Sequence, residues 1–189
     1  SGISTYSISK ERSYQRSTVS HSTLQIDNQN SSDTWASFRV GRKADVSLEQ
    51  INLSKVIDRF IFNHNGYKFL HGSPIHSRSW EITNNYILVK DFVKGFGFHN
   101  IKLNFHFAPN INITFKQKGL LEISYKDHKM INNLLCNLYF DKNLKARLIN
   151  SYYHNGFGLY QTNKMLSIES CSYLPFSHIT KIMLTANNE

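Results

Sequence analysis

The sequence predicts an all-β protein that folds as an antiparallel β-sandwich, and three observations support this fold class. β-Branched and aromatic residues dominate the apolar runs, many runs alternate polar and apolar side chains, and Asn, Gly and Ser separate them. Amphipathic helical spacing is rare, and the best candidate helix covers residues 127–137. Because no repeat, linker or low-complexity block divides the 189 residues, we expect a single domain over residues 1–189.

The predicted strands follow one another from the N-terminus. Residues 23–27 alternate polar and apolar side chains, and the polar run at residues 28–33 then marks a turn. Residues 35–42 form the next predicted strand, and a strand within residues 55–62 precedes Asn65-Gly66, a dipeptide typical of hairpin turns. Further strands are expected within residues 77–94 and at residues 101–107, 110–115 and 120–125.

The charge of the chain favours anionic partners. Lys and Arg number 22 against 13 Asp and Glu, which gives a formal net charge of +9. Such an excess attracts nucleic acid, anionic lipid or acidic polysaccharide without choosing among them, and it also fits a basic surface with no polyanionic partner. The sequence lacks an RNP-type aromatic motif, zinc knuckles and basic helices, which argues against nucleic acid. No apolar run approaches the roughly 20 residues of a membrane span.

The two cysteines give little information about redox compartment. Cys136 lies in an apolar run, where a buried free thiol is expected, and Cys171 is the one residue with which it can pair. Neither has the spacing of a zinc finger, and their redox state stays open at this point.

A more specific pattern lies near the N-terminus. Residues 16–27 read RSTVSHSTLQID and residues 35–42 read WASFRVGR. Together they resemble the signature of the heparinase II/III family, RST-x-x-H-[NS]-T, an apolar strand, an acidic or amide turn, and then W-x-x-F-R. Shorter resemblances follow at residues 64–67 (H-x-G-Y), 76–78 (H-x-R) and 87–91 (I-L-V-x-D). The resemblance runs from about residue 1 to residue 109 and continues weakly beyond.

This resemblance implies the C-terminal sandwich, of the supersandwich type, of a polysaccharide lyase. In that family the sandwich follows an (α/α) toroid, and together they cleave uronic-acid-containing acidic polysaccharide by β-elimination. The toroid and the first part of the sandwich have no counterpart here, so we expect a fragment of a longer protein that is inactive alone. The resemblance also suggests a periplasmic or secreted location. The alternative is a non-catalytic carbohydrate-binding or structural module.

Several residues are candidates for the substrate cleft. β-Elimination needs groups that neutralise the uronate carboxylate, a base and an acid. The family draws its Tyr and one His from the toroid, so we assign no catalytic residue, and Tyr67 more naturally caps a hairpin core. Arg16, Arg39 and Arg78 are candidate donors to carboxylate or sulfate. Alternatively, these arginines pair with acids to hold strand ends, and the acids available are Asp27, Asp33, Asp45 and Asp91.

Histidine and tryptophan residues complete the predicted site. His21 resembles the family His that ligates a structural zinc with a His and an Asp from an upstream segment, which implies zinc in the longer protein and none in this chain. A histidine that is hydrogen-bonded within the sheet is the alternative for His21. His64 and His76 are expected on the same side of the cleft, with turn or surface positions as alternatives. Trp35 and Trp80 are either platforms for sugar stacking or core residues.

Overall fold

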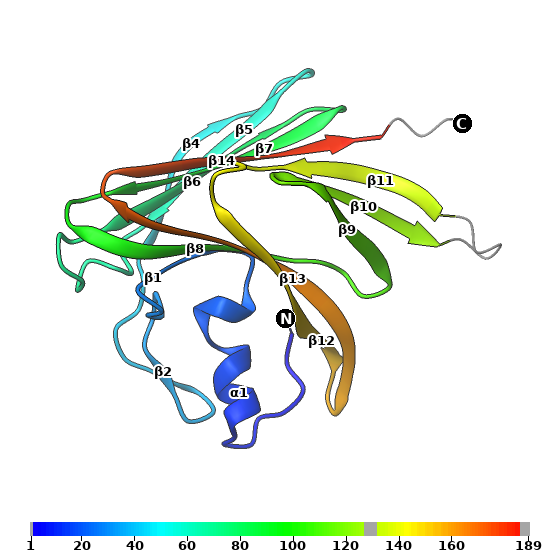
Figure 1. Ribbon diagram of the computed structural model, residues 1–189. Helices are drawn as coiled ribbons and strands as arrows, with labels where there is room; N and C mark the ends of the chain where they lie inside the picture. The colour runs from blue at the N-terminus through cyan, green and yellow to red at the C-terminus, as the bar shows by residue number, and fades with distance from the viewer. Residues whose placement is uncertain (1, 127–131, 186–189) are drawn as a thin grey trace.

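Two antiparallel sheets face each other in the computed structural model, which describes residues 2–126 and 132–185 (Figure 1). The smaller sheet has the order β1 (Leu24–Ile26), β8 (Phe98–His106), β13 (Leu159–Tyr173) and β12 (Lys145–Gly156). The larger sheet has the order β4 (Val46–Asn52), β5 (Asp58–His64), β6 (Ile75–Ile82), β7 (Tyr86–Lys94), β14 (Phe176–Leu184), β11 (Asn132–Tyr139), β10 (Leu120–Lys126) and β9 (Ile111–Gln117). This arrangement confirms the predicted all-β sandwich.

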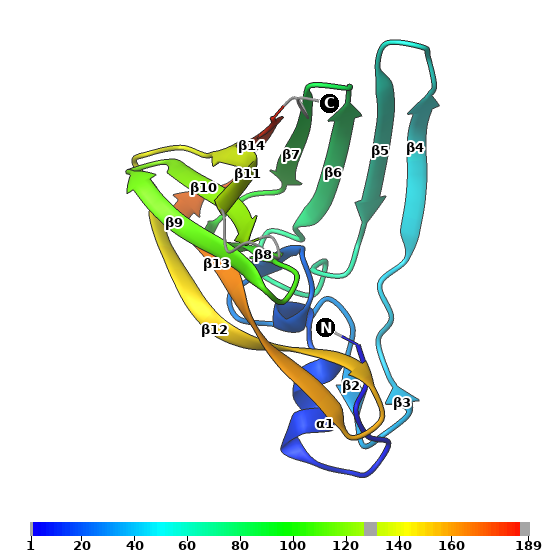
Figure 2. The ribbon, with the colours of Figure 1, turned by 90° about the vertical axis from the view of Figure 1, so that its right-hand side faces the viewer.

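The remaining elements lie at one end of the molecule. They are the helix α1 (Lys10–Gln15), a 3-10 helix (Thr18–Ser20) and a small hairpin of β2 (Thr34–Trp35) and β3 (Arg39–Val40). Figures 1 and 2 both place α1 beside the β12–β13 hairpin, and Figure 1 shows α1 between that hairpin and β2. No helix in the described ranges is long and apolar enough to cross a membrane.

The core lies between the two sheets, where alternate side chains of each strand point inward. In β8, Ile101 and Leu103 are completely buried while Lys102 between them is not, as the alternation in the sequence predicts. Burial of one such aliphatic side chain contributes about 1.5–3 kcal/mol. Other core residues are Leu24, Ile26, Val93, Leu121, Leu138, Leu166 and Ile168.

The predicted helix at residues 127–137 is wrong for its described part, because residues 132–137 belong to β11. This strand pairs with β10 on one side and with β14 on the other, and these two ladders override a weak helical pattern. Residues 127–131 lie outside the described residues.

Three details near the N-terminus also differ from expectation. The strand predicted at residues 35–42 is a hairpin, because the chain reverses at Ala36, whose φ is 48°. The strand β4 was not predicted, since all seven of its residues are exposed and show no alternation of burial. Asn65 begins a turn, in which Lys68 N donates to Asn65 O, but residues 65–74 separate β5 from β6, so the predicted tight hairpin is wrong.

Candidate functional site

The signature residues gather around a small pocket beside the N-terminal end of β1. The pocket has a volume of about 250 Å³ and forms where the 3-10 helix and the loops before and after β1 meet. Its lining residues are Arg16, Thr18, His21, Thr23, Ser31 and Ser32. Sequence analysis predicted Arg16 and His21 for the site but not the hydroxyl groups of the second loop.

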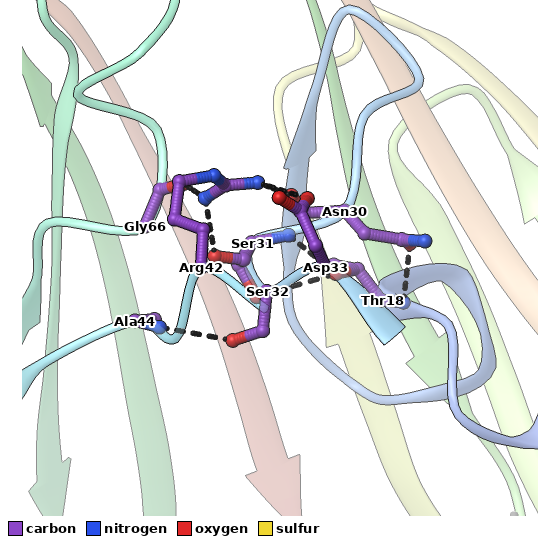
Figure 3. A network of polar contacts seen from close by, with 8 residues as sticks. All are labelled: Thr18, Asn30, Ser31, Ser32, Asp33, Arg42, Ala44 and Gly66. Carbon is purple, nitrogen blue, oxygen red and sulfur yellow. Dashed lines mark hydrogen bonds and ion pairs between the residues drawn. The ribbon is translucent and has the colours of Figure 1, made fainter. Parts of the chain in front are cut away.

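Thr18 joins the two loops that form this pocket (Figure 3). Its backbone N–H donates to Asn30 Oδ1 at 2.9 Å, and its Oγ1 accepts from the N–H of Ser31 at 2.9 Å. Ser32 Oγ accepts from the N–H of Ala44 at 3.0 Å, which ties the second loop to the segment before β4. The polar residues that the sequence marked as a turn therefore form a network of side-chain and backbone hydrogen bonds.

Arg42 holds the outer side of the same loop (Figure 3). Its guanidinium donates to Ser31 O at 2.9 Å and to Asn30 O at 3.1 Å, and it forms an ion pair with Asp33 at 2.6 Å. It also donates to the carbonyl oxygen of Gly66. A Cβ atom at Gly66 would lie 2.5 Å from Ser31 O, so only glycine fits here. Arg42 was not among the site residues predicted from the sequence, where its signal is a second arginine three residues after the arginine of W-x-x-F-R.

Arg16 connects the pocket to the β2–β3 hairpin. Its guanidinium donates to the carbonyl oxygens of Trp35 and Ala36 at 3.2 Å and of Arg39 at 3.0 Å. The side chains of Trp35, which is 49% exposed, and Arg39 are consequently held at the surface next to the pocket. The alternative of an acid partner is wrong for Arg16 and Arg39, since neither forms an ion pair within the described ranges, whereas Asp33 pairs with Arg42 and Asp27 with His99.

His21 is exposed, and the loop that carries it is fixed at Ser22. Arg78 Nη1 donates to Ser22 O at 2.6 Å, and the backbone N–H of His106 donates to Ser22 Oγ at 2.9 Å. Although His21 is accessible to solvent, neighbouring protein atoms remove part of the water around its ring, and this desolvation lowers its pKa below the usual value. The imidazole is therefore neutral at pH 7, the form that accepts a proton or binds a metal.

Arg78 belongs to a row of polar groups that crosses β5, β6 and β7, in which Arg78, His76 and Asp91 are buried and His64 is half-buried. Arg78 Nε and Nη2 donate to the two oxygens of Asp91 at 2.7 and 3.0 Å, and His76 Nε2 lies 2.7 Å from Asp91 Oδ1. His64 Nε2 lies 3.0 Å from His76 Nδ1. The sheet register explains this row, because Arg78 is opposite Asp91 and His64 is opposite His76.

Burial and charge in this row of polar groups shift the pKa values of Asp91 and His64. Burial of Asp91 raises the pKa of its carboxyl, but the hydrogen bonds and positive charges of His76 and Arg78 outweigh burial and hold that pKa below the usual value. Burial, together with the charges of His76 and Arg78, lowers the pKa of His64 to about 4.

The contacts of this row of polar groups also test the alternative positions predicted for Arg78 and His76. Arg78 pairs with Asp91 in the middle of the sheet and not at a strand end. A turn or surface position is wrong for His76, which is buried in β6. Contact of Arg78, His76 or His64 with a substrate stays a prediction, and it would compete with these internal partners.

Tyr67 packs in the interior, and Trp80 packs against a neighbouring strand of the larger sheet. Tyr67 is fully buried, and its hydroxyl donates to Leu24 O at 3.0 Å, which joins the two sheets. Trp80 is partly buried and packs edge-on against Phe62 at 5.9 Å. The thiols of Cys136 and Cys171 are both free; Cys136 is partly buried and Cys171 is exposed.

The residues around His21 do not by themselves fit a zinc site. The other pocket residues are an arginine, two threonines and two serines, none of which is a usual zinc ligand. Within residues 2–126 and 132–185, no three His, Cys, Asp or Glu side chains gather closely enough to hold a metal ion.

Comparison with known proteins places this geometry in a family. The sequence profile described as heparinase II/III-like, C-terminal, matches residues 1–173. The chain belongs to this family. No protein among the curated sequences matches the heparinase II/III-like chain.

Solved structures agree with this assignment at the level of the fold. Heparan sulfate lyase HepC from Pedobacter heparinus is 18% identical with a TM-score of 0.73, over 95% of this chain and 26% of that one. A heparinase III described as the BT4657 gene product is 16% identical with a TM-score of 0.72, over 93% and 25%. Another heparinase III is 15% identical with a TM-score of 0.69, over 95% and 25%. This heparinase II/III-like chain thus spans about a quarter of the length of these structures.

Proposed function

We propose that the chain is the C-terminal domain, over residues 1–189, of a polysaccharide lyase that cleaves uronic-acid-containing polysaccharide by β-elimination. In this proposal the His21 pocket and the β2–β3 hairpin form the sandwich side of the substrate cleft, and a toroid domain supplies the other side. The observation that carries it is the position of Arg16, which lines the His21 pocket and also holds the backbone of Trp35 and Arg39.

The exposed groups next to the pocket suit an acidic sugar. Arg39 is exposed and forms no ion pair in the described part of the chain. Its guanidinium is therefore free to form bidentate hydrogen bonds with a uronate carboxylate or a sulfate. When the guanidinium binds the uronate carboxylate, it neutralises the negative charge of that group and makes the proton on the neighbouring C5 more acidic. The half-exposed indole of Trp35 offers a flat apolar face to a pyranose ring.

The other predicted residues have supporting roles in this proposal. Arg16 and Arg78 position the hairpin and the His21 loop, because their guanidinium groups bind backbone carbonyls of those segments. His21 is proposed as one zinc ligand in the longer protein, where two further ligands must come from outside this chain. The base and the acid are likewise proposed to lie in the toroid.

The test is an assay of the chain joined to its native upstream sequence. We expect unsaturated uronate, detected by its ultraviolet absorbance, from at least one polymer in a panel of heparan sulfate, chondroitin sulfate, hyaluronan and alginate. Arg39→Ala and Trp35→Ala should each lower kcat/KM by about fivefold to 150-fold, since each removes a substrate contact worth about 1–3 kcal/mol. The matched control is Arg147→Ala, which removes an exposed arginine of β12 and should leave kcat/KM unchanged. No product from any polymer would contradict the proposal.

A non-catalytic carbohydrate-binding module is the second candidate, and the exposed pair Trp35 and Arg39 favours it, because these residues need no toroid to bind a sugar. It predicts that the isolated chain binds uronate oligosaccharides on a glycan array and that Trp35→Ala abolishes this binding. Binding without lyase activity in the longer protein would select this candidate.

A further inference from the structure

A larger cavity lies between α1 and the β12–β13 hairpin. Its volume is about 760 Å³, within the range of pockets that bury small molecules, and it shares no lining residue with the His21 pocket. The lining residues come mainly from α1 and from the β12–β13 hairpin, which lie side by side in Figure 1. The lining residues that matter here are Glu11, Tyr14, Ser151, Tyr152, His154 and Tyr160.

Aromatic rings form one wall of this cavity. The rings of Tyr152 and Tyr160 meet edge to face at 5.5 Å, and Tyr160 is 63% exposed, so its face is open to a ligand. The ring of His154 lies 6.5 Å from that of Tyr160. A flat ligand that stacks on Tyr160 is therefore within reach of the imidazole.

Glu11 presents a fixed carboxylate from the opposite wall. Its Oε1 accepts from Ser4 Oγ at 2.6 Å and from Gln15 Nε2 at 3.3 Å. Both contacts use Oε1, so Oε2 remains available to accept a hydrogen bond from a ligand.

His154 lines the cavity close to Glu11. It is only 6% exposed, and its Nδ1 has no hydrogen-bond partner among the described residues. The nearest acid is Glu11, whose Oε1 lies 3.7 Å from Nδ1, too far for a hydrogen bond. This nitrogen is enclosed by protein atoms, so a ligand in the cavity contacts the ring of His154 and not Nδ1.

We propose that this cavity binds an uncharged pyranose unit of a glycan, stacked on Tyr160, with a hydroxyl donating to Glu11 Oε2. The lining contains one cation, Lys10, and one carboxylate, Glu11, so their charges cancel and the cavity suits an uncharged unit better than a uronate. The His21 pocket is different in this respect, since its lining contains Arg16 and no acid. This second site does not depend on β-elimination.

The test is calorimetric titration of the 189-residue chain with N-acetylglucosamine, glucose, the disaccharide cellobiose and glucuronate. We expect binding of at least one uncharged sugar and weaker or no binding of glucuronate. Tyr160→Ala and Glu11→Gln should each raise Kd about tenfold or more. Tyr173→Ala is the matched control, because Tyr173 is also an exposed tyrosine of β13 but packs against Phe98 away from the cavity.

Two results would overturn the proposal. One is the absence of binding by every uncharged sugar at millimolar concentration, and the other is an unchanged Kd in folded Tyr160→Ala. Circular dichroism and the urea midpoint identify variants that fail to fold, and Tyr160→Phe, which keeps the ring, should then keep the wild-type Kd. Arg39→Ala separates the two sites, since it should impair the proposed lyase and leave this titration unchanged.

Discussion

The Asp91→Asn substitution keeps the shape of a completely buried side chain and removes its charge. Asp91 accepts two hydrogen bonds from Arg78 and lies against His76, and Arg78 is itself only 7% exposed. In the variant the guanidinium stays buried without a counter-charge, and removal of one partner from a buried pair costs about 3–5 kcal/mol. This is a large part of the roughly 5–15 kcal/mol by which domains are usually stable. We expect the free energy of unfolding at pH 7 to fall by about 3–5 kcal/mol.

Urea denaturation followed by tryptophan fluorescence measures this change, because Trp80 packs beside Arg78. The matched control is Glu169→Gln, which makes the same chemical change in an exposed pair with Arg147 and should cost at most about 1 kcal/mol. An Asp91→Asn variant within 1 kcal/mol of the wild type, or one no less stable than Glu169→Gln, would refute the reasoning.

The same variant also changes the response to acid. The folded-state pKa of Asp91 lies below the unfolded value, so its contribution to stability is complete above the unfolded pKa and is lost as pH falls through the folded pKa. Asp91→Asn should lack this loss. It should also speed amide hydrogen exchange at residues 22–24, since Arg78 holds Ser22 O.

Three further predictions concern other groups of the fold and the site. The pKa of His64 is about 4 when folded and about 6.5 when unfolded, so the unfolded state binds more protons between these values. The free energy of unfolding, measured by urea denaturation, should therefore fall by up to about 3 kcal/mol from pH 6.5 to pH 4 through this group, and His64→Gln should reduce the slope by that amount while His21, His106 and His178, whose pKa values are also lowered, keep theirs. Tyr67→Phe leaves the buried Leu24 O without its donor and should lower stability in thermal unfolding by about 1–3 kcal/mol, and an unchanged Tm would contradict the hydrogen bond. Arg42→Ala should cost about 2–4 kcal/mol in urea denaturation, whereas the exposed Arg39→Ala should stay within about 0.5 kcal/mol; equal effects would show that Arg42 does not hold the loop.

The sequence predicted the parts of the fold in which burial alternates along a strand. Burial alternates over part of β6, β7, β8 and β10, and these strands were predicted. The strands β1, β5 and β9 were also predicted, from the alternation or the β-branched and aromatic content of their sequences, although their burial does not alternate regularly. The strand β4 has no buried face, and the reversal at Ala36 needs a positive φ that an alanine does not signal. The long strands β12, β13 and β14 were not assigned individually, although they complete both sheets.

The candidate site was predictable in its residues and less so in their roles. The signature placed Arg16, His21 and Trp35 in one region, and the fold brings Arg16 to the other two. The choice of Asp91 as the partner of Arg78 depends on the register between β6 and β7, which the sequence does not specify. The cavity beside α1 was missed because its walls come from segments more than a hundred residues apart.

The strand β4 forms one border of the larger sheet, with only β5 beside it in the part of the chain that the structure describes. Its outer amide and carbonyl groups can therefore pair with a strand from another molecule, and the exposed Val46, Leu48 and Ile51 would give such pairing an apolar contact. Concentrated preparations of the chain should accordingly be prone to self-association by edge-to-edge addition. Leu48→Lys would discourage that addition, because charged side chains at the edge of a sheet oppose pairing with another strand. The core would not be disturbed, since Leu48 is exposed.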